Sequence, residues 1–470
     1  MFSVNASKIR LRNAGTQAIV RRNAGVTDRD NLIAAQVREI RAGAPAFQRC
    51  QRAQCHLLTD AAAQEIRGVY VATQVHQEKE HVLSLDSIRG IAAVTVVVHH
   101  VIRMPTFLAA FSTPPWIECT YFRAGGFLVD LFFVLSGMVM SMSYVQSDFG
   151  RFSLREFMVR RFARIYPLHF VMLIVLLLFR LLRIGLVTLG VIAAMPAVFE
   201  VNNAYSFILN VFLLHSLGFL DYLNWNAPSW SISVEFYTYL VFGLVVLAAQ
   251  RLGSVRWLYA SAAVLAVASW LALAVWIGRE EIGAQYDFGI LRCFASFFLG
   301  VLTVKAVSYV PRAMSPAAKG AIQFAALLVA LVNVCFIEAW PWISYLAPLT
   351  FSVFLGSLLA FPDAAVLPRL LVMKPLVWVG KRSYSIYMVH AFVILLAEYG
   401  VRAFGHRPIA WLESIYPGLP ATLNLFALIA VVLVASDFTY RRVELQGGKL
   451  VRRWLQDNRF FAGAPATNST

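Results

Sequence analysis

Residues 85–102 read Leu85-Asp-Ser-Ile-Arg-Gly-Ile-Ala-Ala-Val-Thr-Val-Val-Val-His-His-Val-Ile102, an apolar run that is charged only near its start. Comparable runs of about 20 apolar residues, long enough to cross a bilayer as helices, recur along the chain. In lipid each segment must satisfy its own backbone hydrogen bonds, so these runs predict helices and not open sheets. The expected fold class is therefore all-α, a polytopic transmembrane helix bundle of about ten spans. These spans lie near residues 86–105, 125–145, 165–183, 230–249, 255–277, 289–306, 319–336, 343–361, 384–400 and 420–437.

The composition indicates a membrane protein and argues against a soluble globular one. Of the 470 residues, 59% are apolar and 14% are charged, whereas about 25% of residues are charged in a typical soluble domain. The charged residues collect in short clusters between the apolar runs. The net charge of +16 is most simply explained by Lys and Arg in cytosolic loops, so nucleic acid is not an expected partner.

The basic loops predict the topology. Lys and Arg cluster near residues 151–164, 251–256, 305–319 and 362–382, and again in the C-terminal residues 441–453. These loops alternate with loops that are poorer in Lys and Arg. Because cytosolic loops carry the excess of positive charge, both termini are predicted to be cytosolic.

One stretch without basic residues tests this count. Residues 184–229 contain no Lys or Arg, but they hold two apolar pieces, near 185–199 and 206–219. Either both pieces cross the membrane or neither does, because a single crossing would turn every later basic loop outward. Both pieces are short and interrupted, so we expect that neither crosses and that they form an outer re-entrant or interfacial element.

The chain divides into three expected segments. Residues 1–82 are polar and basic and are expected to form a disordered N-terminal tail, residues 83–445 a membrane-embedded domain, and residues 446–470 a cytosolic C-terminal tail. The cysteines are scattered without zinc-site spacing, so we predict no metal site and no disulfide framework. They are Cys50, Cys55, Cys119, Cys293 and Cys335.

The first span carries the leading catalytic candidate. Arg89 and His100 are eleven residues apart, which places them within about 20° of each other round a helix, while His99 points about 100° away from His100. The helical rise puts His100 roughly 16 Å deeper than Arg89, near the middle of the bilayer. An ionisable residue at that depth is a candidate functional group, and histidine is the usual general base. The alternative is a histidine that a neighbouring helix satisfies, and the span alone does not separate the two.

Two carboxylates are expected at a similar depth. Asp130 and Glu235 each enter a span from the outer side, roughly 7 Å below the boundary by helical rise. A carboxylate beside an imidazole fixes its tautomer and stabilises its protonated form. The alternative is that one or both pair structurally with an arginine such as Arg292.

Polar groups at the cytosolic ends are candidates for binding a substrate. Arg161 and Arg164 are three residues apart on one helix face and could hold phosphates bidentately, although topogenic charge is the simpler interpretation of this pair alone. Ser383 begins the ninth span, and His390 lies about 10 Å inside it. His390 could contact a thioester or a neighbouring helix, and the sequence leaves both open.

Five motifs, in order, resemble those of the acyltransferase 3 family of integral-membrane acyltransferases. The resemblance covers about residues 83–445. The motifs are Leu85-Asp-Ser-Ile-Arg-Gly-Ile-Ala-Ala with His100 at the Arg-x10-His spacing, Phe132-Phe-Val-Leu-Ser-Gly137, Arg160-Arg-Phe-Ala-Arg-Ile-Tyr-Pro167, Trp230-Ser-Ile-Ser-Val-Glu235 and Ser383-Tyr-Ser-Ile-Tyr-Met-Val-His390.

The resemblance implies a reaction. The family moves an acyl group, often acetyl, from cytosolic acyl-CoA to a hydroxyl, commonly of an envelope or exported glycan and sometimes of another small molecule. It implies that His100 is catalytic, that Arg89 is its partner, and that Arg161 and Arg164 lie near the donor. We expect His100 to act as general base with Asp130 or Glu235 orienting it, with no permanently bound cofactor and with acyl-CoA as co-substrate. The expected location is a bacterial inner membrane.

Two other classes of function stay open. A secondary transporter also places His, Asp and Glu at mid-membrane, but it is expected to show repeats with broken helices, and no clear repeat is found. A non-catalytic membrane scaffold does not need Arg89 and His100 on one helix face. The acyl group, the acceptor and the oligomeric state are not predicted from the sequence.

Overall fold

The computed structural model describes residues 83–104, 112–146, 149–191, 200–404 and 407–457. Within these ranges the chain is helical with connecting loops and has no strand, which confirms the all-α prediction. After a first helix over residues 83–101, the main α-helices are α5 (Thr120–Arg123), α6 (Leu128–Ser141), α7 (Leu154–Thr188), α8 (Ala204–Val211), α9 (Trp230–Arg251), α10 (Val255–Leu271), α11 (Gly289–Val307), α12 (Pro316–Phe336), α13 (Ala347–Ala360), α14 (Leu367–Leu371), α15 (Lys374–Lys381), α16 (Ser383–Phe404), α17 (Arg407–Ile415), α18 (Leu419–Thr439) and α19 (Leu445–Asp457).

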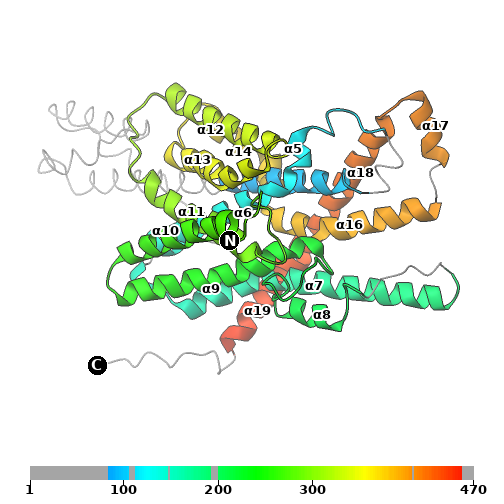
Figure 1. Cartoon of the computed structure of the whole chain (residues 1–470), viewed down its shortest axis with the longest axis horizontal. Helices are drawn as coiled ribbons and strands as arrows, with labels where there is room; N and C mark the ends of the chain where they lie inside the picture. Colours follow the sequence, from blue (N-terminus) through cyan, green and yellow to red (C-terminus); the bar gives the residue numbers. More distant parts are fainter. Residues whose placement is uncertain (1–82, 105–111, 147–148, 192–199, 405–406, 458–470) are drawn as a thin grey trace, which may run out of the picture. The chain divides into compact units, whose positions relative to one another are not determined.

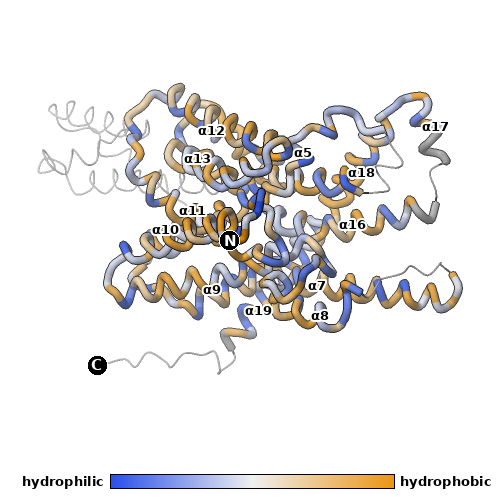
Figure 2. Tube along the Cα trace, viewed as in Figure 1, coloured by the Kyte–Doolittle hydropathy of each residue, from blue (hydrophilic) through white to orange (hydrophobic). Residues whose placement is uncertain are grey.

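Nine helical segments of the described chain are long and apolar enough to cross a membrane. They match the expected spans from the second to the tenth, and Figure 2 shows apolar colour along most of α10, α12 and α13. The expected first span corresponds to the helix over residues 83–101, which is not one of the nine. The protein is therefore an integral, multi-pass membrane protein. The cytosolic location of both termini stays a prediction.

The basic-poor stretch contributes no span in its described part. Helix α7 runs to Thr188, and α8 has 8 residues, about 12 Å of helix, which is too short for a hydrocarbon core of about 30 Å. This supports the prediction that the piece 206–219 does not cross. The other piece, 185–199, lies partly outside the described residues.

The helices gather in groups that bring distant parts of the sequence together. Helices α12, α13 and α14 lie together, as do α16 and α18, while α19 packs on α7 (Figure 1). The first helix meets the end of α15 through two glycines, Gly90 and Gly380. A Cβ on Gly380 would lie 2.2 Å from the carbonyl oxygen of Asp86, so only glycine permits this approach. The contact brings Arg89 close to the start of α16.

Candidate functional site

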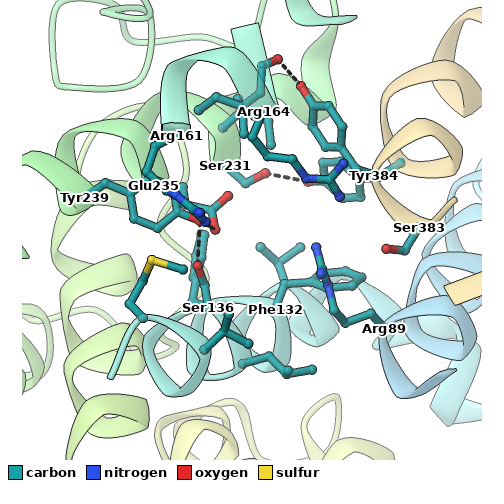
Figure 3. A pocket seen from close by; sticks show the side chains of 18 residues that line it. Arg89, Phe132, Ser136, Arg161, Arg164, Ser231, Glu235, Tyr239, Ser383 and Tyr384 are labelled. Carbon is teal, nitrogen blue, oxygen red and sulfur yellow. Dashed lines mark hydrogen bonds between the residues drawn. The ribbon is translucent and has the colours of Figure 1, made fainter. Parts of the chain in front are cut away.

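A pocket lies where the first helix, α6, α7, α9 and α16 meet (Figure 3). Five of the eight residues that the sequence singled out line it: Arg89, Arg161, Arg164, Glu235 and Ser383. The other polar lining residues are Ser136, Ser231, Tyr239, Tyr384 and Tyr387. Side chains from spans that are far apart in the sequence therefore converge on one pocket. His100, Asp130 and His390 do not line the pocket.

The arginine pair of α7 faces the pocket. Arg161 lies between aromatic rings, with its guanidinium carbon 5.8 Å from the ring centre of Tyr239. Its Nε is buried and has no hydrogen-bond partner among the described residues. The adjacent Arg160 instead pairs with Glu156 at 3.0 Å on the exposed side of the helix. A basic residue that serves only to set membrane topology can point its side chain in any direction. The side chains of Arg161 and Arg164 both face the pocket, which favours a binding role.

The charged side chains that line the pocket have a net positive charge. Arg89 has one loose ion pair with the residues that the structure describes, 3.8 Å from the carboxylate of Asp86. Arg164 forms an ion pair with Glu444, and its guanidinium carbon lies 5.8 Å from the ring centre of Tyr384. Three guanidinium groups thus face a pocket with one lining carboxylate, that of Glu235. Such a set suits an anion with several phosphate oxygens, which guanidinium groups bind bidentately.

Glu235 belongs to a hydrogen-bonded chain of three side chains that joins α9 to α6. The Tyr239 hydroxyl donates to the Glu235 carboxylate at 2.6 Å, and it lies 2.7 Å from the Ser136 hydroxyl. All three residues line the pocket. The expected contact between Glu235 and His100 is not present, because this carboxylate is held by Tyr239 and faces the pocket.

His100 is oriented by its own helix and not by a carboxylate. Its Nδ1 lies 2.9 Å from the carbonyl oxygen of Val96, one turn back. A carbonyl only accepts, so this bond places the ring proton on Nδ1 and leaves Nε2 free to act as a base. The ring of His99 packs edge-on against the ring of His100, 5.1 Å centre to centre, but its Nδ1 bonds a different group, 3.1 Å from the carbonyl oxygen of Phe122. The two histidines therefore have different hydrogen-bond partners, and the orienting group of His100 is corrected to a backbone carbonyl.

Asp130 pairs structurally with Arg292, which was the alternative to a catalytic role. Its buried carboxylate receives Nη2 of Arg292 at 2.8 Å and the hydroxyl of Ser296 at 2.9 Å. Both partners lie on α11, so the ion pair ties α6 to α11. The prediction that Asp130 orients His100 is wrong in this structure, because Arg292 and Ser296 hold the carboxylate while Nδ1 of His100 bonds the carbonyl of Val96.

His390 lies between the pocket wall and His100. It is fully buried, and its ring centre lies 4.9 Å from that of His100 and 5.8 Å from that of Tyr387. Tyr387 lines the pocket, and its ring packs against Phe132, another lining residue. Neither ring nitrogen of His390 has a hydrogen-bond partner in the part of the chain that the structure describes. His390 therefore connects the pocket to His100 through ring contacts.

Several site residues were missed by the sequence analysis. Tyr387 stands inside the motif that begins at Ser383, and Tyr239 lies one helical turn after Glu235, so both could have been found by helical spacing. Glu444 gave no usable signal, because its partner Arg164 is 280 residues away. No group of three His, Cys, Asp or Glu residues within the described ranges is arranged to hold a metal ion.

The chain resembles a known protein family and several known proteins. The family model described as "Acyltransferase domain" matches residues 82–441. A peptidoglycan O-acetyltransferase, OatA, of Listeria monocytogenes is 25% identical over 341 residues, covering 68% of this chain and 50% of that protein. The O-acetyltransferase OatA of Staphylococcus aureus is 26% identical over 335 residues, covering 67% and 51%.

A third relative covers more of the chain. The putative peptidoglycan O-acetyltransferase YrhL of Bacillus subtilis is 26% identical over 402 residues, which is 80% of this chain and 56% of that protein. The chain thus spans about half the length of the curated relatives it matches. No solved structure matches it significantly.

Proposed function

Because this chain belongs to the acyltransferase domain family, we propose that it is a membrane O-acyltransferase that moves an acyl group from acyl-CoA to a hydroxyl of a glycan. The observation that carries the proposal is the pocket in which Arg89, Arg161 and Arg164 converge from two helices. Coenzyme A carries several phosphate charges, and guanidinium groups in a partly dry pocket are the side chains best suited to bind them.

The pocket offers a different surface for each part of the donor. The three arginines would bind the phosphates, and they lie near helix ends that the basic loops predict to be cytosolic. Phe132 and Tyr387 form an aromatic wall, against which the less polar arm with its thioester would lie. The acyl group would then point toward His390 and His100.

His100 is proposed as the general base. Its Nε2 takes the proton of the acceptor hydroxyl while the hydroxyl oxygen attacks the thioester carbonyl. The carbon–sulfur bond then breaks, and the departing thiolate of CoA takes the proton back from His100. A positioned base of this kind contributes about 10²–10⁴-fold to the rate. His390 and Tyr387 lie between His100 and the pocket, so the thioester has to extend past them for this step, with the donor entering from the side of the arginines and the acceptor from the side of His100.

The acceptor class is proposed from the relatives. The three relatives are named as O-acetyltransferases, two of them of peptidoglycan. We therefore propose acetyl as the acyl group, a glycan of the cell envelope as the acceptor, and a bacterial inner membrane as the location. Because the arginines would hold the donor at the helix ends predicted to be cytosolic, we propose that the acceptor reaches His100 from the outer side.

The proposal is tested with purified protein, radiolabelled acetyl-CoA and soluble peptidoglycan fragments. Label is expected to appear on the glycan in a form that mild base releases, as an O-ester does, with one CoA thiol freed for each acetyl group transferred. A transporter would move a solute without consuming acetyl-CoA, and a scaffold would do neither. Failure to bind CoA or to release its thiol would contradict the proposal.

A further inference from the structure

A buried carboxylate from the C-terminal end of the described chain reaches the arginine pocket. Glu444 ends the short π-helical turn η8 (Tyr440–Glu444) that joins α18 to α19, and its side chain is only 1% exposed. One carboxylate oxygen forms the ion pair with Arg164 of α7. The other accepts a hydrogen bond of 2.8 Å from the Ser385 hydroxyl of α16. Both oxygens of Glu444 are therefore used, and they join three separate parts of the chain.

The local backbone explains how Glu444 becomes buried. A π-turn places an extra residue in one helical turn and changes which side chains face inward, and such turns are frequent at functional sites. In η8 this leaves Tyr440 and Glu444 buried while Arg441 and Arg442 are exposed. The turn therefore separates one buried acid from the basic residues beside it.

Two glycines then hold α19 against α7. A Cβ on Gly448 would lie 2.7 Å from the carbonyl oxygen of Ala163, and one on Gly447 would lie 2.8 Å from Cβ of Pro167. Ala163 and Pro167 flank Arg164 on α7. The close approach therefore fixes Glu444 at the level of Arg164, and a larger residue at Gly448 would move it away.

The pairing leaves most of the Arg164 guanidinium available. A guanidinium has five N–H donors in a fixed plane, and the ion pair with Glu444 uses Nη1. The Arg164 side chain stays 38% exposed and lines the pocket beside Tyr384. Glu444 thus restrains the orientation of Arg164 from behind while the remaining donors can face a ligand.

We propose that Glu444 is a positioning residue for the acyl donor, which holds Arg164 in the plane that meets a donor phosphate. Ser385 fixes the second oxygen of Glu444, and α19 is therefore part of the donor site and not a separate tail. This inference rests on the proposed donor pocket. Glu444 itself does not line the pocket, so it acts through Arg164.

The test compares Glu444→Gln with a matched control. Glutamine keeps the shape and can still bond Ser385, but it loses the charge that orients Arg164. We expect the KM for acetyl-CoA and the Kd for CoA to rise about tenfold, with kcat at saturating acetyl-CoA close to that of the parent. The control is Asp437→Asn, which breaks the nearby ion pair with Arg382 but touches no pocket residue. It is expected to keep the parental KM even if it lowers thermal stability.

A double-variant cycle shows whether Glu444 acts through Arg164. In an Arg164→Gln background, adding Glu444→Gln is expected to leave CoA affinity unchanged and to recover thermal stability, because it removes a buried carboxylate that has lost its ion-pair partner. A further loss of affinity in the double variant would overturn the inference, as would a parental KM in folded Glu444→Gln protein.

A second variant keeps the test decisive if Glu444→Gln does not fold. Ser385→Ala removes only the hydrogen bond to the second oxygen, and it is expected to raise the KM about threefold; an unchanged KM would overturn the role of Glu444. Failure of the proposed donor pocket is distinguishable, because in that case the parent protein itself would not bind CoA.

Discussion

The ring of His390 lies 4.9 Å from the ring of His100, centre to centre, and it is fully buried between His100 and the wall of the arginine pocket. The sequence placed these histidines on separate spans, eight helices apart in the expected order. Their contact connects a pocket suited to a polyanionic donor with a histidine whose Nε2 is available as a base.

Replacing His390 is expected to slow transfer without weakening donor binding. His390→Phe keeps an aromatic ring in the buried position but removes both ring nitrogens, so kcat should fall about 10²-fold if His390 supports proton transfer near His100. His390 does not line the pocket, so the Kd for CoA should match the parental value. Calorimetric titration of CoA and steady-state transfer rates measure the two effects separately. A parental kcat would assign His390 to packing alone.

The arginine pair should bind the donor through guanidinium geometry. Arg161→Lys with Arg164→Lys keeps the charge on which topology depends but loses the planar fork. CoA binding should weaken by about 1–3 kcal/mol, and insertion should be normal. Arg160→Lys is the matched control, because Arg160 pairs with Glu156 on the exposed side of the same helix. If the double variant and the control bind CoA with equal affinity, Arg161 and Arg164 serve only to set the membrane topology.

Substitution of Asp130 should lower the stability of the fold, whereas substitution of Glu235 should affect acyl transfer or donor binding. Asp130→Asn leaves Arg292 buried without its charged partner, which costs about 3–5 kcal/mol, so thermal unfolding in detergent should shift to clearly lower temperature. Glu235→Gln leaves that ion pair intact and should act mainly on transfer or donor binding, because Glu235 lines the pocket. If Asp130→Asn unfolds at the parental temperature, the ion pair between α6 and α11 is not a structural tie.

Topology is tested with single cysteines in a cysteine-free protein. Ser315 begins the turn before α12 and is exposed, and it lies in a loop predicted to be cytosolic. Ser414 of α17 is exposed and lies in a loop predicted to be outside. In intact cells an impermeant thiol reagent should label Ser414→Cys and should label Ser315→Cys only after the membrane is opened. The reverse labelling pattern would mean that the helix bundle has the opposite orientation in the membrane.

The sequence predicted those features that depend on spacing along one segment. Apolar run length located the helices, and helical spacing placed Arg161 and Arg164 on a common face, which the pocket confirms. Pairings between segments were not predictable in this way. Asp130 had two possible partners, and only helix packing decides that Arg292 takes both of its oxygens.

Local hydrogen bonding was the other source of error. A carboxylate was expected beside His100, yet the carbonyl of Val96, four residues back in the same helix, already holds its Nδ1. Glu444 was not among the predicted site residues, since nothing in its neighbourhood in the sequence indicates Arg164 as a partner. Its role depends on a π-turn and on the close packing of α19 against α7.

The assignment of His100 as the general base is tested by comparing His100→Ala with His99→Ala. The two rings touch, but the ring of His100 packs against His390 and its Nδ1 bonds the carbonyl of Val96, while His99 bonds the carbonyl of Phe122. Purified variants are incubated with radiolabelled acetyl-CoA and soluble peptidoglycan fragments, and glycan-bound label is measured beside the Kd for CoA. We expect His100→Ala to bind CoA normally and to transfer no acetyl group above background, and His99→Ala to keep most of the parental rate. Near-parental acetylation by folded His100→Ala protein would contradict the role of His100 as general base.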